Sequence, residues 1–160
     1  MAIVNFENLV PLLRNNQRII GIDWGDKMIG VALSDTRRKI ASPFKTIQSK
    51  RLKADANEII NLIEEFDAGA LVVGMPYHMN GTEGERCQKT KNFIYEFLRL
   101  YDCPIVIWDE RLSTKAAEAS MLEGDLSRKK RGKVIDRVAA CYILQGALDC
   151  LSLYEEKSEL

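Results

Sequence analysis

The sequence predicts an α/β protein in which helices cover both faces of one mixed β-sheet. Two apolar runs joined by a short polar turn lie between Arg18 and Asp35, a pattern typical of a β-hairpin. Further along, short apolar runs at residues 71–74 and 105–108 alternate with segments of helical periodicity. An antiparallel start followed by β/α alternation favours a sheet with both antiparallel and parallel strands.

The composition narrows the class of protein. At 160 residues, the chain has the size of a single domain with a full hydrophobic core. The formal net charge is zero, so a surface that binds nucleic acid would have to be a local patch. No apolar run approaches the ~18 residues that a membrane span needs, and the first residues show neither a basic leader nor a small-residue cleavage site. We therefore expect a cytoplasmic protein.

The cysteines agree with that compartment. They are widely spaced and form no CxxC pair, which does not suit a zinc site and is most simply explained by reduced thiols. The four are Cys87, Cys103, Cys141 and Cys150, and we expect Cys141 to lie in the core.

The segments on either side of the hairpin are less regular. Residues 1–16 form an N-terminal extension, in which we expect a short helix at 5–15 that is weakened by Pro11. Residues 40–47 are a possible third strand. Because Pro43 cannot donate a hydrogen bond to a β-ladder, this strand should lie at an edge of the sheet or contain a bulge.

The middle of the chain contains two predicted helices. Apolar residues recur at helical spacing from Lys53 to Phe66. After the strand that follows, a loop contains an Asn80-Gly81 turn. Thr82, with Glu85 three residues later, predicts a capping box that starts a helix reaching about Tyr101.

The last third of the chain is expected to be helical apart from one basic stretch. A helix capped by Ser113 or Thr114 should reach about Glu123, and a final helix should run from about Lys133 to Leu153. The segment between these helices is polar and strongly basic. Residues 154–160 should form a frayed tail.

Three acidic residues are placed where a site could form. Asp23 ends the first strand and Glu110 follows the last one, and ligands in open α/β sheets gather outside the carboxyl ends of strands. Asp136 lies near the start of the final helix, where the helix dipole alone could explain it. Glu110 could equally be a solvated loop acid paired with Arg111. Asp23 is different, because a lone carboxylate on a strand buried on both faces is costly.

Carboxylates without a His or Cys cluster suggest hard oxygen ligands for Mg²⁺ or Mn²⁺. Two such ions about 4 Å apart could activate a water and stabilise the leaving oxygen in phosphodiester hydrolysis. His78 is the only histidine. Its position in a loop beside Tyr77 and Met79 favours a surface role over Ser-His or Cys-His catalysis.

A basic run lies just before Asp136. It could grip phosphates or simply be a solvated helix face, and the sequence leaves both readings open. Its members are Arg128, Lys129, Lys130, Arg131 and Lys133. No aromatic residue interleaves with them, so base stacking on this segment is not indicated.

Four ordered motifs resemble the YqgF/RuvX family, and together they span about Arg18 to Asp149. They are GIDWGDKMIGVALSD, VVGMPYHMNGTEGERCQ, IWDERLST and KKRGKVIDRVAA. The resemblance implies a ribonuclease H-like fold with a five-stranded mixed sheet. The family is described both as a Holliday junction resolvase and as the nuclease that matures the 5′ end of pre-16S rRNA.

The resemblance also implies roles for individual residues. The family's three acids fall on Asp23, Glu110 and Asp136, as catalytic and metal-binding residues. Gly25 and Gly30 match its hairpin glycines, which would leave room for close packing or for a phosphate. Trp24 stands where that family often has Phe or another apolar residue, a departure that leaves the acid set undisturbed.

The leading hypothesis is a nuclease that uses Mg²⁺ or Mn²⁺, with two ions, on structured nucleic acid. Arg111 and Lys115, with the basic run, would hold the substrate backbone. One expected substrate is pre-16S rRNA, presented in a ribosomal precursor particle. The alternative is branched DNA, which would make the protein a Holliday junction resolvase in recombination. The protein would act as a monomer or homodimer.

Two other classes remain open from the sequence. One is an actin- or sugar-kinase-like ATPase, which shares the DxG hairpin but normally closes two domains around its nucleotide, whereas this chain has room for one. The other is a non-catalytic ribosome-associated module, which the complete acid set disfavours.

Overall fold

The computed structural model describes residues 3–112 and 128–159, and the side chains of residues 112, 128–135, 158 and 159 are outside that description. Lys115 and the helix expected to reach Glu123 lie outside the described residues.

The core of the molecule is a five-stranded sheet with the strand order β3-β2-β1-β4-β5. Strands β1, β2 and β3 pair antiparallel, whereas β4 and β5 continue the sheet parallel to β1. The mixed sheet predicted from the sequence is therefore confirmed. The strands are β1 (Arg18–Asp23), β2 (Met28–Ser34), β3 (Ala41–Gln48), β4 (Ala68–Met75) and β5 (Ile105–Asp109).

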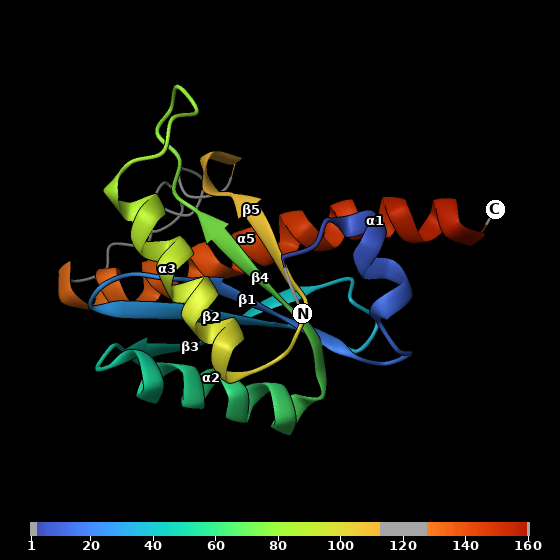
Figure 1. Ribbon diagram of the computed structural model, residues 1–160, viewed down its shortest axis with the longest axis horizontal. Helices are drawn as coiled ribbons and strands as arrows, with labels where there is room; N and C mark the ends of the chain where they lie inside the picture. The colour runs from blue at the N-terminus through green and yellow to red at the C-terminus, as the bar shows by residue number, and fades with distance from the viewer. Residues whose placement is uncertain (1–2, 113–127, 160) are drawn as a thin grey trace.

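Helices cover both faces of this sheet (Figure 1). The helices α2 and α3 lie on one face, and the long helix α5 crosses the other face, where the short helix α1 also packs. The helical elements are α1 (Phe6–Leu9), η1 (Val10–Leu12), α2 (Leu52–Phe66), α3 (Glu85–Leu100), η2 (Glu110–Leu112) and α5 (Arg128–Glu159).

Strand β1 explains why the hairpin is so apolar. Ile20 and Ile22 point into the core beneath α2 and α3, whereas Ile19 belongs to the core beneath α5. Alternate residues of a strand face opposite sides, so a central strand covered on both faces must be apolar throughout. Asp23 is the exception at its end, on the α5 side by the same alternation.

Strand β3 lies at the edge of the sheet, as Pro43 predicts. The register between β2 and β3 shifts between Val31 and Ala32, which pair with Lys45 and Pro43. The residue skipped by this shift is Phe44, next to Pro43, so the proline lies beside an irregularity of an edge strand, where a residue without an N–H is tolerated.

Four local expectations are wrong. Thr82 does not cap α3: its N–H and hydroxyl both donate to the side-chain oxygen of Asn80, and Gly84 is the N-cap. The last helix begins at Arg128 and ends at Glu159, so it includes the basic run, and residues 154–159 are helical rather than frayed. Cys141 is half-buried rather than in the core, and its thiol donates to the carbonyl of Ala41.

The four cysteines are all free thiols. Within the described part of the chain, no helix is both long and apolar enough to cross a membrane.

Candidate active site

The carboxyl ends of β1, β4 and β5 meet at one edge of the sheet, because these strands are parallel. Asp23 is the last residue of β1, and Glu110 directly follows β5. Their side chains share a hydrogen bond, although β4 lies between their strands. Glu110 is only 8% exposed, so its interpretation as a solvated loop acid is wrong. Arg111, its suggested partner, forms an ion pair with Asp109.

Gly74 on β4 allows this contact. A Cβ atom on Gly74 would lie 2.7 Å from Cγ of Glu110 and 2.5 Å from Cδ1 of Ile143. The side chain of Glu110 therefore passes directly over β4 to reach Asp23, where any larger residue would obstruct it. Sequence reasoning missed this residue, although a glycine at the end of an otherwise apolar strand is a known sign of close approach.

Asp136 is brought to the same edge by α5. Gly30 is the partner of Asp23 across the β1–β2 ladder. A Cβ atom on Gly30 would lie 2.0 Å from the carbonyl oxygen of Asp136, so the helix backbone rests directly on the glycine. The expected role of Gly30 in close packing is confirmed.

Burial and a neighbouring acid make both Asp23 and Asp136 costly to ionise. The pKa of Asp23 lies well above 3.8, mainly because the carboxyl is buried and also because Glu110 bonds to it and repels its charge. Burial and the charge of Asp23 raise the pKa of Asp136 to about 6. A cation bound among these carboxylates would offset both effects.

Arg86 is the positive side chain that acts on this cluster. It lies in the first turn of α3 and is exposed, and its charge lowers the pKa of both Asp23 and Asp136, against the larger effects above. No sequence pattern identifies Arg86, because the approach of its side chain to the acids depends on where α3 packs. The nearest signal was its position directly after the GTEGE loop.

The donor chemistry suits a hard divalent cation, but the described residues contain no group of three His, Cys, Asp or Glu side chains that could hold one ion together. Asp23 and Glu110 are in direct contact, whereas Asp136 is affected by the charge of Asp23. A carboxylate pair is still sufficient for Mg²⁺, which is often held by one or two carboxylates together with waters and substrate phosphates.

The predicted backbone-binding residues divide into two groups. Arg111 is already engaged: its guanidinium bonds Asp109, donates to the carbonyl of Met79 at 3.3 Å and lies 5.8 Å from the ring centre of Tyr77. The basic run Arg128 to Lys133 lies at the start of α5, the end of that helix nearer Asp136. Its role as a phosphate grip stays a prediction.

Known proteins resemble this chain in sequence and fold. Residues 17–150 match the family described as "RuvX: Holliday junction resolvase". A protein of Methylocella silvestris named "Putative pre-16S rRNA nuclease" is 51% identical over 139 residues, which cover 87% of this chain and 86% of that protein. A protein of the same name from Paramagnetospirillum magneticum is 46% identical over 149 residues, covering 93% and 96%.

Among solved structures, T. thermophilus RuvC in complex with a Holliday junction substrate superposes with a TM-score of 0.53 at 13% identity, covering 84% of this chain and 94% of RuvC. That likeness confirms the ribonuclease H-like fold. The match to the family over most of the sequence, and the identity to its relatives, show that the chain belongs to the RuvX family.

Proposed function

We propose that this protein is a metal-dependent endonuclease that processes the 5′ end of pre-16S rRNA. The observation that carries the proposal is the contact between Asp23 and the buried Glu110 at the carboxyl edge of the sheet. Two carboxylates held together away from water cost stability, and such a cost is typical of a site built to bind a cation or to perform chemistry. The substrate is inferred from the names of the close relatives.

Asp23 and Glu110 would hold Mg²⁺ or Mn²⁺, with Asp136 beside them as a third carboxylate. A bound ion would supply Lewis-acid stabilisation of the negative charge that develops as water attacks the phosphate. Arg86 would hold a non-bridging phosphate oxygen, since its charge already acts on Asp23 and Asp136. Asp136, with a pKa of about 6, could exchange a proton with water near neutral pH.

The basic residues at the start of α5, together with Lys115, would bind the substrate backbone further from the cleaved bond. We propose that the substrate is presented in a ribosomal precursor particle in the cytoplasm. A monomer contains all of the residues proposed here.

Cleavage of a four-way DNA junction is the second candidate, because the family description names that activity. Membership of this family does not favour a kinase-like ATPase. A non-catalytic module would have no reason to retain a buried pair of carboxylates.

The test offers the purified full-length protein a small-subunit rRNA precursor and a four-way DNA junction side by side, with Mg²⁺ or Mn²⁺. We expect endonucleolytic cuts in the precursor at the 5′ end of the mature RNA, and their loss in Asp23→Asn and Glu110→Gln. The matched control is Asp26→Asn, an exposed carboxylate on the same hairpin that pairs with Lys89.

Two results would contradict the proposal. Cutting that persists in Asp23→Asn would point to a contaminating nuclease or to a different site. Symmetrical cutting of the junction with the RNA left intact would favour the resolvase.

A further inference from the structure

A pocket of about 390 Å³ opens directly beside the carboxylates. It is formed by the loop between β4 and α3, the first turn of α3 and the residues after β5. Among the described residues, its lining includes Tyr77, His78, Met79, Arg86, Glu110 and Arg111. The pocket and the proposed active site therefore share Glu110 and Arg86.

The loop that forms one wall is internally bonded. The N–H of His78 donates to the carbonyl of Thr82 at 2.9 Å, and the N–H of Gly81 donates back to the carbonyl of His78 at 2.8 Å. Asn80 accepts two further hydrogen bonds from Thr82. In Figure 1 this loop rises away from the sheet at the top of the view, coloured green.

Arg111 ties the same loop to the end of β5. Asp109 holds its guanidinium with hydrogen bonds of 2.5 to 3.0 Å, and the guanidinium reaches the carbonyl of Met79. Asp109 and Arg111 thus act as a brace under the loop, with the Tyr77 ring packed against the guanidinium. A pocket with bonded walls exists before its ligand arrives, so binding does not have to order it.

The lining suits a flat, partly apolar ligand with an anionic attachment. Tyr77 and His78 contribute aromatic rings to the lining, and Met79, which is 67% exposed, adds an apolar side chain. Every nucleobase, whatever its identity, can stack on an aromatic side chain. The volume lies near the lower end of the ~300–1000 Å³ range of small-molecule sites, enough for one nucleotide but not for a duplex.

We propose that this pocket binds a single unpaired nucleobase whose own phosphate, or the adjacent one, lies at Asp23 and Glu110. The enzyme would then select cleavage sites at which one nucleotide is free of a duplex, since a paired base must be extruded from its stack to enter such a pocket. This inference rests on the proposed nuclease function, and it adds what that function leaves open: how the cleaved bond is chosen.

The test measures binding without cleavage. Asp23→Asn protein is titrated with single-stranded RNA oligonucleotides that span the mature 5′ end of small-subunit rRNA, each with one abasic residue at a different position. We expect affinity to fall about 10- to 100-fold at one position, next to the bond that the wild-type enzyme cuts, and much less elsewhere.

Variants of the residues that line the pocket test whether the lower affinity for an abasic RNA arises there. Tyr77→Ala and Met79→Ala should weaken binding of the intact RNA and remove the penalty of the abasic residue, whereas Tyr77→Phe should retain the penalty. The control is Tyr95→Ala, which removes a tyrosine that is 54% exposed on α3 and does not line the pocket. Because Met79 is so exposed, its variant should fold normally.

The outcomes separate this inference from the proposed function. If the wild-type enzyme cuts the precursor but every abasic oligonucleotide binds equally well, the pocket inference is wrong and the nuclease function stands. If a single position matters and the protein cuts nothing, the base pocket stands and the nuclease function fails. Equal cutting of a fully paired site would also overturn the inference.

Discussion

At the carboxyl ends of the strands, the two acids Asp23 and Glu110 are in contact. At the opposite edge, where β1 begins, the guanidinium of Arg38 is surrounded by hydrogen-bond acceptors. Both sites are partly or largely buried, and α5 contributes to each: Asp136 near its start and Glu155 near its end. The first site concentrates charge of one sign. The second balances it.

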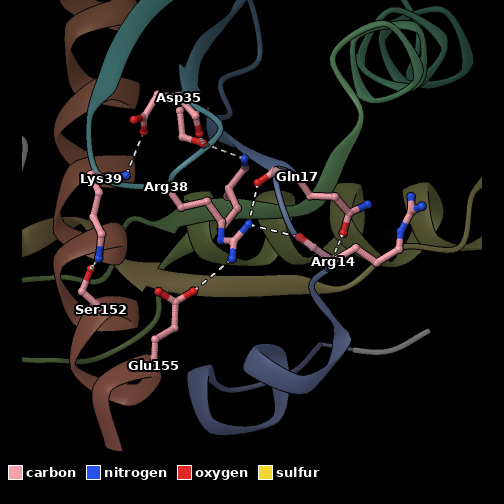
Figure 2. A network of polar contacts seen from close by, with 9 residues as sticks. Arg14, Gln17, Asp35, Arg38, Lys39, Ser152 and Glu155 are labelled. Atoms are coloured by element: carbon pink, nitrogen blue, oxygen red, sulfur yellow. Dashed lines mark hydrogen bonds and ion pairs between the residues drawn. The ribbon is translucent and has the colours of Figure 1, made fainter. Parts of the chain in front are cut away.

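Figure 2 shows the polar contacts around Arg38, in which its two terminal guanidinium nitrogens are bonded while its Nε is buried without a hydrogen-bond partner among the described residues. The guanidinium of Arg38 donates to the carbonyl of Gln17 at 2.8 Å and to that of Arg14 at 3.3 Å, and it pairs with Glu155 at 3.2 Å. It joins the segment before β1, the turn after β2 and the end of α5. Lys39 adds a second link, from its ammonium to the hydroxyl of Ser152 at 3.1 Å.

The difference separates stability from function. Removing a buried charge from its acceptors destabilises the fold, whereas buried like charges are themselves unfavourable unless a ligand offsets them. Substitutions that neutralise a charge should therefore have opposite effects on stability at the two edges.

The largest expected effect is at Asp23. If Asp23 binds the metal as proposed, Asp23→Asn should lower Mg²⁺-dependent cleavage by at least about 100-fold, because loss of a direct ligand costs more than loss of an outer partner. The same variant should unfold at a higher urea concentration than wild type at pH 7, since its amide can donate to Glu110 instead of repelling it. Added Mg²⁺ should raise the thermal midpoint of the wild type and leave that of the variant unchanged. A variant that is both inactive and unstable would mean that Asp23 is structural.

At the opposite edge, Arg38→Ala should reduce the free energy of unfolding by about 2 kcal/mol, because it removes the ion pair with Glu155 and the hydrogen bonds to the carbonyls of Arg14 and Gln17. Cleavage per folded molecule should not change. Arg37→Ala is the control, as its side chain is exposed. Arg38 has a φ of 56°, so Arg38→Gly loses the same bonds but relieves the strain, and should be about 1 kcal/mol more stable than Arg38→Ala.

Gly74→Ala tests how the carboxylate contact is built. Its methyl group would collide with Cγ of Glu110 and Cδ1 of Ile143, displacing the carboxylate from Asp23. We expect cleavage to fall about 10-fold, as is usual for misplaced partners of a metal site, and stability to fall by about 1 to 2 kcal/mol from overpacking. In a Glu110→Gln background, the substitution should cause little further loss of cleavage, measured under single-turnover conditions. Additive losses would show that Gly74 acts elsewhere.

The two edges also differ in how far the sequence predicts them. Asp23 and Glu110 were identifiable because each follows a short apolar run, and the order of strands and helices implied that such ends meet. The contribution of Gly74 was not identifiable from the sequence, because it depends on β4 lying between β1 and β5. Arg86 and Arg38 were missed for the same reason. The partner of Arg38 is 117 residues away, and no local pattern marks a contact between a turn and the end of a distant helix.

Local sequence patterns gave wrong predictions for the starts of α3 and α5. Thr82 and Glu85 have the spacing of a capping box, but the Thr82 hydroxyl donates to Asn80, and α3 starts at Glu85, with Gly84 as its N-cap and no side-chain cap. The start of α5 was placed too late because a basic run looks like a solvated loop. A helix tolerates lysine and arginine well, so composition alone did not separate the two.

The smallest expected effect concerns Asp136 and the pH dependence of stability. Its pKa rises from 3.8 to about 6 on folding, so between these values the folded protein binds more protons than the unfolded chain. Stability from this residue is therefore fully present below about pH 4 and is lost as the pH rises through 6. At pH 7, Asp136→Asn should be more stable than wild type by about 1 to 2 kcal/mol, allowing for the partial exposure of the side chain.

Urea unfolding at pH 4, 5, 6 and 7 measures this difference directly, and it should shrink toward zero at the acid end. Asp149→Asn, at an exposed position of the same helix, controls for the general effect of asparagine in α5. A stability difference that stays constant with pH would mean that the substitution acts through packing and not through the charge of Asp136. The same measurement in an Arg86→Ala background tests the role of Arg86. If Asp136→Asn stabilises the protein at pH 7 more in that background than in the wild type, the charge of Arg86 offsets part of the cost of ionising Asp136.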